Sequence, residues 1–331
     1  MAALFSFGII ADVQYADIDT CYNFNHTRLR YYRNAKPLLR NAVDHWISEQ
    51  DISFVTQLGD VIDGFNTRKG KRESWRALTE IMDEFDRFSG KLHHLIGNHE
   101  LYNFSRKEIY ESKLFSADEF QSGQDHTIED PEDERKKFYY HFSPEAGYRF
   151  VILDSYDVSM LGWGADSAIM QQATQIVTSV NSNQELNSPL GLEGLETRFV
   201  KFNGAIGDRQ RNWLRHVLQT AENDEEKVFI FGHIPFHPNK TSDNICLLWD
   251  YDQVLEILHQ FKCVVATFAG HSHTGSYTHD AKHIHHIVVP AVVEAPPGSD
   301  AFGTVAVYDD RIVINGHGSV KSAEFRYQST P

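Results

Sequence analysis

The segment FVTQLGDVIDG, residues 54–64, predicts a buried strand that carries a carboxylate to a site at its end. Phe54, Val55 and Leu58 form a short apolar run of the kind that fills a strand. The run stops at a glycine followed by Asp60. Because ligands of open α/β sheets bind beyond the carboxyl ends of the strands, we expect Asp60 to face a binding site.

Four further segments repeat this arrangement, and most of them place the polar group behind a glycine. They are Asp12-Val13-Gln14, Gly97-Asn98-His99-Glu100, Gly232-His233 and Gly270-His271-Ser272-His273. Carboxylate, amide and imidazole groups at five strand ends predict a dinuclear metal centre. The candidate ligands are Asp12, Gln14, Asp60, Asn98, His233, His271 and His273. A carboxylate can bridge two ions, and Asp60 fits that role.

The segments between the motifs alternate between strand-like and helix-like patterns. Strands are predicted at 5–11, 54–58, 92–96, 149–153, 228–231 and 264–269, and helical periodicity marks 35–47, 75–88, 208–218 and 251–261. We expect Ser89-Gly90 to end the second helix and Asp208 to cap the third. The β-rich segments 284–293, 304–308 and 311–315 predict closing antiparallel strands. The chain is interpreted as one α/β domain, 1–331, with insertions near 104–148 and 156–205.

Charge and hydropathy exclude two classes of partner. The 331 residues carry a formal net charge of -15, which argues against binding a nucleic-acid polymer or an anionic membrane. No apolar run approaches the roughly 20 residues that span a bilayer. A small anionic substrate remains compatible with this charge, because bound cations reverse the local field in a cleft.

The cysteines and the N-terminus indicate a cytoplasmic protein. The three cysteines have no CxxC spacing and leave an odd one over, which predicts reduced thiols. The N-terminal segment MAALFSFGIIAD lacks a basic region and leads directly to Asp12, so it is interpreted as a core strand and not a signal peptide. Nothing in the sequence demands a partner chain, and a monomer is expected.

Taken in order, the five motifs resemble the signature of the calcineurin-like metallophosphoesterase family, D-x-H, G-D-x-x, G-N-H-E/D, G-H and G-H-x-H. The resemblance implies a four-layer α/β/β/α sandwich. It also implies that one metal ion is bound by Asp12, Gln14, Asp60 and His273, and the other by Asp60, Asn98, His233 and His271. His99 matches a non-ligand histidine that hydrogen-bonds the scissile phosphate or assists the leaving group. Asn98 and His99 together would stabilise the developing charge.

Gln14 departs from the family pattern, which usually has histidine at this position. An amide oxygen is a harder donor than imidazole, so the departure favours Mn²⁺, with Mg²⁺ possible and Zn²⁺ disfavoured. It is typical of a subgroup that hydrolyses nucleoside diphosphate-linked small molecules, and the segments DVQYAD, GNHELYNF and GHIPFHP resemble that subgroup too. The resemblance implies cleavage of the pyrophosphate bond of ADP-ribose or CDP-alcohols, releasing AMP or CMP, by in-line attack of a metal-bridging hydroxide.

Three other functions were compared with this hypothesis. A cyclic-nucleotide phosphodiesterase or a phosphomonoesterase would use the same centre, because the insertions set specificity. A protein Ser/Thr phosphatase is disfavoured because Asp63 is followed by glycine where those enzymes carry arginine. A non-catalytic scaffold would usually have lost ligands or His99, whereas all seven candidate positions hold competent donors.

Candidates for substrate binding come from two loops. Tyr22 or Phe24 could stack on a nucleobase and Arg28 or Arg30 could meet a distal phosphate, although aromatic residues there could equally cover the sheet. His237 and Cys246 follow the Gly232-His233 motif and are further candidates. The four histidines at 279, 283, 285 and 286 could indicate an extra metal site, but alternating positions on a strand explain them as well.

Overall fold

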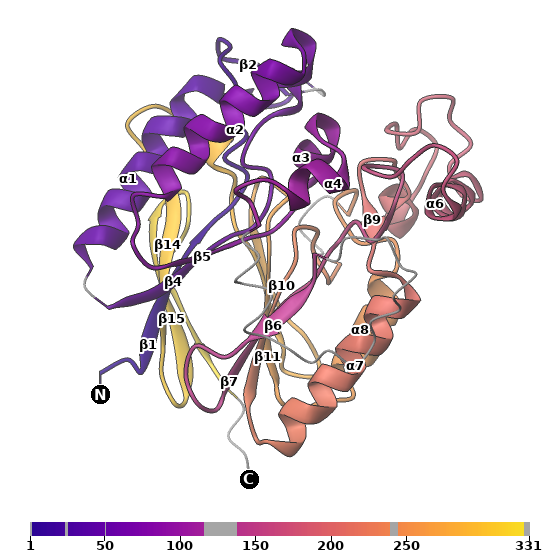
Figure 1. The fold of residues 1–331 in the computed structure, drawn as a ribbon. Helices are drawn as coiled ribbons and strands as arrows, with labels where there is room; N and C mark the ends of the chain where they lie inside the picture. The colour runs from indigo at the N-terminus through magenta and orange to yellow at the C-terminus, as the bar shows by residue number, and fades with distance from the viewer. Residues whose placement is uncertain (1, 24–25, 50, 116–137, 239–243, 328–331) are drawn as a thin grey trace.

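The computed structural model describes residues 2–23, 26–49, 51–115, 138–238 and 244–327. Its framework is two six-stranded sheets packed face to face, with helices covering both outer faces (Figure 1). The expected four-layer α/β/β/α sandwich is confirmed. Phe5 and Arg326, near the two ends of the described chain, lie at the same end of the first sheet.

The first sheet has the order β16-β15-β14-β1-β4-β5. Its strands are β1 (Phe5–Ile10), β4 (Ile52–Gln57), β5 (Lys91–His94), β14 (Ala301–Val307), β15 (Arg311–Gly318) and β16 (Ala323–Arg326). Strands β1, β4 and β5 run parallel, whereas β14 pairs antiparallel with β1 and with β15. The parallel half therefore delivers the ends of β1, β4 and β5 to one edge.

The second sheet has the order β12-β13-β11-β10-β7-β6. Its strands are β6 (Tyr140–Phe142), β7 (Tyr148–Ile152), β10 (Lys227–Phe231), β11 (Val264–Ala269), β12 (Ser276–His279) and β13 (His285–Val288). Strands β7, β10, β11 and β13 run parallel, and the two outer strands are antiparallel to their neighbours.

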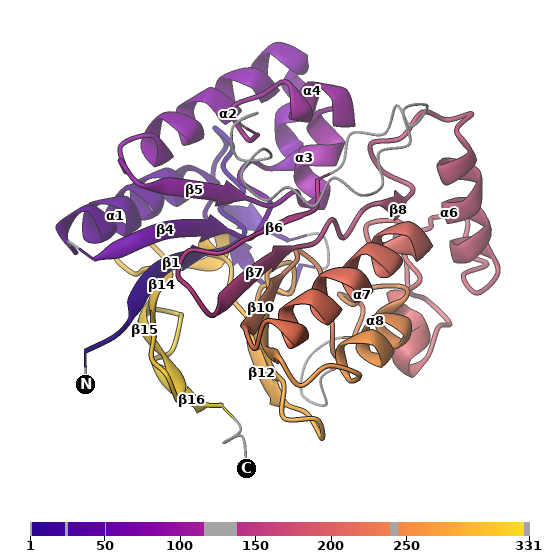
Figure 2. The ribbon, with the colours of Figure 1, turned by 60° about the horizontal axis from the view of Figure 1, so that its bottom comes forward.

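The outer layers are amphipathic helices. The first sheet is covered by α1 (Ala35–Ser48) and α2 (Lys71–Phe85), and the second by α7 (Gly207–Asn223) and α8 (Tyr251–Leu258) (Figure 2). Helix α1 packs close to β1 because Gly8 has no side chain: a Cβ there would lie 2.6 Å from Trp46 Cε2. The remaining face of each helix is polar, as the sequence pattern requires.

Aromatic side chains fill the space between the sheets. Phe7 of β1 stacks on Phe54 of β4, with ring centroids 5.1 Å apart, and meets Phe150 of the second sheet edge-on at 5.3 Å. Phe231 of β10 stacks on Phe268 of β11 at 5.0 Å. All these rings are buried, and burial of such apolar area fixes how the two sheets sit on one another.

Short elements form the rim beyond the strand ends. They are β2 (Cys21–Tyr22), β3 (Leu29–Arg30), η1 (Tyr32–Asn34), η2 (Gly64–Lys69), α3 (Asn98–Asn103), α4 (Arg106–Tyr110), β8 (Val158–Ser159), α6 (Ala168–Thr178), η3 (Gly194–Arg198), β9 (Gly204–Ala205) and η4 (Val292–Glu294). Residues 116–137 of the first expected insertion lie outside the described residues.

Three details of the expected fold are wrong. Helix α2 ends at Phe85, before Ser89-Gly90. Asp208 lies in the first turn of α7, whose N-cap is Ile206, so its carboxylate faces the helix dipole instead of capping. The segment 284–293 is a closing antiparallel strand only in part: β13 pairs antiparallel with β12 but parallel with β11, and it is followed by η4.

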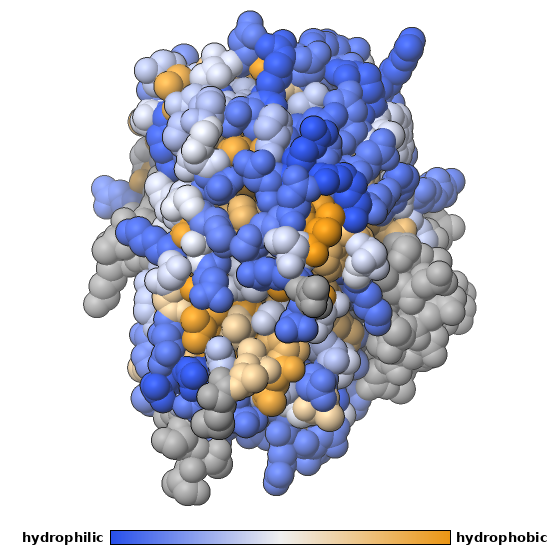
Figure 3. Space-filling model, turned by 90° about the vertical axis from the view of Figure 1, so that its left-hand side faces the viewer, coloured by the Kyte–Doolittle hydropathy of each residue, from blue (hydrophilic) through white to orange (hydrophobic). Residues whose placement is uncertain are grey.

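The surface is largely polar on the side where Figure 1 places α1. Hydrophilic side chains cover most of the upper part of this side, and hydrophobic ones gather in its lower part (Figure 3). None of the helices within the described residues has the length and apolar character required to cross a bilayer.

Candidate metal centre

The polar groups predicted at the strand ends meet at one edge of the sandwich. Asp12, Asp60 and Asn98 follow β1, β4 and β5 of the first sheet, and Asn98 begins α3. His233 follows β10, and His271 follows β11 of the second sheet. Parallel strands of each sheet end at the same edge, so residues far apart in sequence become neighbours.

Asp60 lies at the centre of the cluster. Its Oδ2 is 3.3 Å from His233 Nε2 and 3.1 Å from Gln14 Nε2. Its Oδ1 accepts a hydrogen bond from the His99 main-chain N–H at 2.8 Å. This carboxylate therefore contacts donors from both expected ligand sets, as a bridging group would.

Asp12 lies beside the histidines that follow β11. Its Oδ2 accepts the main-chain N–H of His271 at 3.0 Å, and its Oδ1 is 3.5 Å from His273 Nε2. The rings of His233 and His271 are 4.9 Å apart. Asp60, His233 and His271 each offer one ligand atom, and these three atoms lie within 4.8 Å of one another.

The main chain is constrained at these positions. Asp12, Gln14, Asp60 and His271 all have positive φ angles, between 43° and 63°. This left-handed region is costly for residues other than glycine, and such costs are concentrated at functional sites. Gly97 has no positive φ, but a Cβ there would overlap Asp60 Oδ1, so the glycine allows the close approach.

Burial shifts the pKa values of the candidate ligands, and the buried carboxylates of Asp12 and Asp60 require positive charge nearby. Burial raises the pKa of Asp12 to about 7. Burial has the same tendency at Asp60, but the nearby His233 and His99 outweigh it and lower the pKa of Asp60. Burial lowers the pKa of His273 to about 4 and that of His271 well below its ordinary value, so both rings are neutral at pH 7, as metal ligands must be.

Two buried side-chain atoms are available to bind a cation. Among the described residues, Asp12 Oδ1 and His233 Nε2 have no hydrogen-bond partner. Buried polar atoms without partners are rare, and each calls for an explanation such as an ion. Carboxylate and imidazole donors at such distances suit divalent cations of the Mn, Fe and Zn series.

The sequence matches the calcineurin-like phosphoesterase family model over residues 5–275. The chain belongs to this family. It is 43% identical over 329 residues to a protein of Xenopus tropicalis named manganese-dependent ADP-ribose/CDP-alcohol diphosphatase, covering 98% of this chain and 94% of that protein. The human protein of the same name is 42% identical over 328 residues, with 98% and 93% coverage. A solved dimetal phosphatase from Danio rerio superposes with a TM-score of 0.91, at 42% identity, covering 98% of this chain and 100% of the other.

In this calcineurin-like phosphoesterase, a second set of residues holds the candidate ligands. His233 Nδ1 donates to Leu58 O at 2.7 Å, His271 Nε2 lies 2.8 Å from Asn203 Oδ1, and His273 Nδ1 lies 2.7 Å from Glu294 Oε1. Tyr156 donates its hydroxyl to Asn98 Oδ1 at 3.2 Å. Partners of this kind fix the orientation of metal-ligating side chains. Sequence reasoning missed Asn203, Tyr156 and Glu294; the first two lie in loops, Glu294 ends η4, and none belongs to a motif.

Glu100 is a further residue to which sequence reasoning gave no role, although it belongs to the GNHE motif. Its side chain is fully buried and accepts hydrogen bonds from the main-chain N–H groups of Asp60, Val61 and Gly97, each at 2.8 Å. It thereby fixes the turn that presents Asp60.

His99 lies at the edge of the cluster. Its Nδ1 accepts a hydrogen bond from the Gly64 N–H at 2.8 Å and is 3.1 Å from Asp63 Oδ2. Its Nε2 is 3.9 Å from Asp60 Oδ2. Because Nδ1 accepts from the main chain, Nε2 carries the proton and is directed to the candidate metal centre. Burial lowers the pKa of His99, but Asp60 and Asp63 outweigh burial and raise it overall.

The Gln14 amide is turned differently from the expected oxygen donor. Its Nε2 faces His273 Nε2 at 3.0 Å, whereas its Oε1 accepts from Arg30 Nη1 at 3.2 Å. A half-turn of the amide would exchange the two atoms and present the oxygen to an ion. Arg30, which the sequence suggested only as a possible phosphate contact, therefore helps to orient Gln14 together with Asp60.

The substrate-binding candidates are distributed around this edge. Phe24 lies outside the described residues. Tyr22 is exposed in β2. Arg28 forms an ion pair with Glu294 at 2.8 Å, and Glu294 in turn contacts His273. Cys246 is half-buried, in the loop that Asn203 holds through a hydrogen bond to Ile245 O at 2.6 Å. His237 lies elsewhere: its ring stacks on His286 with centroids 4.6 Å apart.

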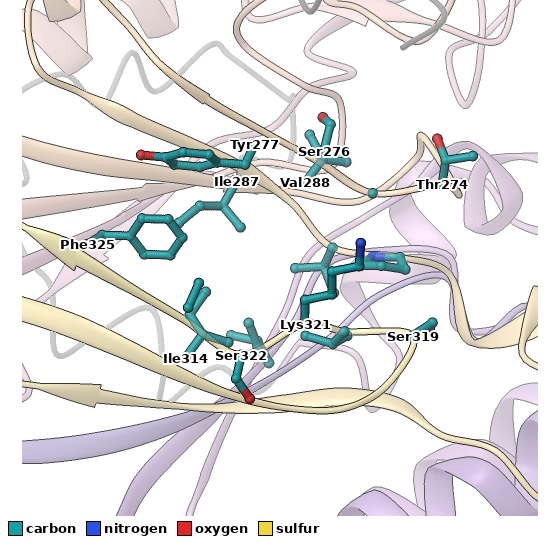
Figure 4. Close-up of a pocket in the computed structure, with 16 residues that line it drawn as sticks. Thr274, Ser276, Tyr277, Ile287, Val288, Ile314, Ser319, Lys321, Ser322 and Phe325 are labelled. Atoms are coloured by element: carbon teal, nitrogen blue, oxygen red, sulfur yellow. The ribbon is translucent and has the colours of Figure 1, made fainter. Parts of the chain in front are cut away.

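A separate cavity of about 400 Å³ opens between β12 and β13 of the second sheet and β15 and β16 of the first (Figure 4). The side chains of Tyr277, Ile287, Ile314 and Phe325 surround it, and Thr274 lines one end. None of the seven candidate ligands lines this cavity. It is therefore a gap between sheet edges and separate from the candidate metal centre.

Proposed function

We propose that this chain is a manganese-dependent diphosphatase that hydrolyses ADP-ribose and CDP-alcohols at the pyrophosphate bond, releasing AMP or CMP. What carries the proposal is the meeting of seven donor side chains and His99 at one edge, in a chain 39–43% identical over 97–98% of its length to proteins with that name. The covered share of those proteins is 91–98%, so the comparison extends over nearly the whole of each protein.

The donors divide into two sets around Asp60. We assign Asp12, Gln14, Asp60 and His273 to one ion, and Asp60, Asn98, His233 and His271 to the other. Two divalent ions held by these residues would supply an activated water and neutralise charge on the phosphates. Gln14 makes the first set richer in oxygen donors, which favours Mn²⁺ over Zn²⁺.

The chain's own residues would bind and orient the substrate. The Nε2–H of His99 is available to donate to a phosphate oxygen or to protonate the leaving group. Arg28 and Arg30 bring positive charge to the same edge, since Arg28 contacts Glu294 at 2.8 Å and Arg30 contacts Gln14 at 3.2 Å. These guanidinium groups are suited to a second phosphate, because arginine binds phosphate oxygens in a bidentate manner.

The test is turnover by metal-stripped protein with Mn²⁺, Mg²⁺ or Zn²⁺ added back. ADP-ribose, CDP-choline and a cyclic nucleotide are offered separately, and products are identified by chromatography. We expect AMP and CMP, with the highest rate in Mn²⁺. Hydrolysis of the cyclic nucleotide alone would replace the proposed substrate with the alternative one, and no turnover with any ion would support the non-catalytic scaffold.

Two variants connect the activity to the centre. Asp60→Asn and His233→Ala should abolish turnover with little loss of secondary structure, whereas His283→Ala, which changes an exposed histidine, should not. An unchanged rate in either of the first two variants would contradict the assignment.

We also propose that the protein is a cytoplasmic monomer. The cysteines form no disulfide with one another among the described residues, which agrees with a reducing compartment. Sedimentation measurements on the purified chain would test the monomer.

A further inference from the structure

A second cluster of metal-ligating side chains lies outside the candidate metal centre. The carboxylate of Asp280, whose side chain is 3% exposed, has its Oδ2 2.8 Å from His259 Nε2 and 3.1 Å from His286 Nε2. The His237 ring stacks on His286. One ligand atom each from His237, Asp280 and His286 lies within 4.8 Å of the others.

This cluster is remote from the candidate metal centre. His286 of β13 pairs with Thr267 of β11, which precedes His271 by four residues, or about 13 Å of strand at roughly 3.3 Å per residue. The flanking Ala266 and Phe268 point into the space between the sheets. Side chains alternate along a strand, so Thr267 and His286 face the opposite side, towards the outer helices.

The hydrogen bonds of the histidines prepare them as ligands. His237 Nδ1 lies 2.7 Å from Pro238 O, and a carbonyl only accepts, so this nitrogen carries the proton and Nε2 has a free lone pair. His286 Nδ1 lies 2.9 Å from Thr267 Oγ1, so this nitrogen can donate its proton to the hydroxyl oxygen and leave Nε2 with a lone pair. Metal-ligating histidines usually donate their other ring N–H to an oxygen.

Asp280 is held rigidly for this role. Its Oδ1 accepts the main-chain N–H groups of Lys282 at 2.8 Å and Ile284 at 2.9 Å, which closes the turn between β12 and β13. Its Oδ2 is left to face the histidines. The ligand atoms around a tetrahedral Zn²⁺ lie about 3.3–3.5 Å apart, whereas those of His237, Asp280 and His286 lie within 4.8 Å of one another, so binding would require these three to close by up to about 1.5 Å.

We propose that His237, Asp280 and His286 form a Zn²⁺ site that is separate from the dinuclear centre, and that His259, which now contacts Asp280 Oδ2 at 2.8 Å, would complete it as a fourth donor. Three imidazoles and one carboxylate are a donor set that Zn²⁺ prefers to Mn²⁺. The ion would join the loop after β10, the end of α8, the β12–β13 turn and β13 itself. The site would therefore be structural, because it would connect the loop that contains His237 to β13 and to the β12–β13 turn.

The test is the Zn²⁺ content of the full chain. Metal-stripped protein is incubated with excess Zn²⁺, freed of unbound ion by gel filtration and analysed by mass spectrometry of the metal. Asp280→Asn keeps an oxygen for the turn but loses the anionic ligand, and we expect it to retain one Zn²⁺ fewer per chain than the wild type. His283→Ala removes an exposed histidine of the same turn and should retain as many as the wild type.

The comparison does not depend on the dinuclear centre. The same pair of proteins is prepared with Asp60→Asn added, and the difference of one ion should persist. Equal Zn²⁺ contents of the wild type and Asp280→Asn would overturn the proposal, and so would an equal loss in His283→Ala. If Asp280→Asn fails to fold by circular dichroism, His237→Ala, which changes a half-buried ring at the edge of the cluster, replaces it with the same expected loss.

Discussion

The Glu100 side chain fixes the main chain of Asp60 through hydrogen bonds in the turn that follows β4. Glu100 Oε2 accepts the Asp60 N–H, and Oε1 accepts the N–H of Val61, both at 2.8 Å. The same Oε2 also accepts the Gly97 N–H, so one buried side chain connects the turns after β4 and β5. The positions of Asp60 and Asn98 therefore depend on each other.

Glu100→Gln is expected to destabilise this connection. Glutamine has one acceptor oxygen for the four main-chain N–H groups that now donate to Glu100, and its NH₂ group must face at least one of them. An orphaned buried donor costs about 1–3 kcal/mol, so the free energy of unfolding should fall by about that amount. Urea unfolding measures it, and Glu145→Gln at an exposed position should show no change. Equal stabilities of the two variants would disprove the role of Glu100.

Gly97→Ala should disable the centre through one methyl group. The added Cβ would overlap Asp60 Oδ1 and would lie 2.8 Å from the Asp60 main-chain nitrogen, so the carboxylate must move. A misplacement of about 1 Å can reduce turnover about 10²-fold, and we expect a loss of this size in kcat/KM with Mn²⁺.

The matched control for this change is Gly164→Ala. A Cβ at Gly164 meets nothing within 4 Å, and the residue has no positive φ. Wild-type kinetics are expected for this control. Wild-type kinetics for Gly97→Ala as well would show that Asp60 tolerates displacement.

Gln14→His should change the metal preference. Gln14 lies 3.0 Å from His273, so an imidazole in its place would add a nitrogen donor to the same set. Because imidazole suits Zn²⁺ better than an amide oxygen does, the ratio of Zn²⁺- to Mn²⁺-supported turnover should rise about tenfold or more. Metal titrations of the stripped protein measure this ratio. Gln219→His adds a histidine on exposed α7 and should leave the ratio unchanged; a rise there too would point to nonspecific binding.

His94→Leu should make the fold less sensitive to acid. Neither ring nitrogen of His94 has a hydrogen-bond partner among the described residues, and its ring meets Phe85 edge-on at 5.0 Å. Burial lowers its pKa from 6.5 to about 4. Between these values the unfolded chain binds a proton that the folded chain does not, so stability falls as the pH decreases from 6.5 towards 4.

This loss amounts to about 2 kcal/mol at pH 5, from about 1.4 kcal/mol per pH unit. Leucine cannot bind the proton, so the drop in unfolding free energy between pH 7.5 and pH 5 should be smaller by about that amount in the variant. Both proteins are measured metal-free, so that protonation of the candidate ligands affects them equally. His283→Ala serves as the control, and identical pH slopes for His94→Leu and wild type would refute the argument.

The parallel strands and amphipathic helices could be predicted because their signals are local. Apolar residues recur with the helical period in α1 and α2, and the strands before Asp12 and Asp60 end at recognisable motifs. Helix α6 escaped recognition because it buries only Ala173 and Val177. The parallel pairing of β13 with β11 was not expected because β12, whose sequence SYTH is half exposed, was not recognised between them in the chain.

The residues that hold the ligands could not be predicted for a different reason. Asn203, Tyr156 and Glu294 contact His271, Asn98 and His273 from segments 21 to 68 residues away in the chain. Their sequence surroundings contain no period and no motif, and only the packing of the two sheets brings them together. The same holds for His237, whose place beside His286 depends on the path of the loop after β10.

The donors of the proposed centre are shared between the two sheets, with Asp12, Asp60 and Asn98 on the first and the three histidines on the second. Separating the sheets at this edge and releasing the ions are therefore a single event. The lifetime of the native protein, as distinct from its equilibrium population, would then be set by how slowly that edge opens. A protease that cleaves only the opened sandwich would report the residence time of the metal.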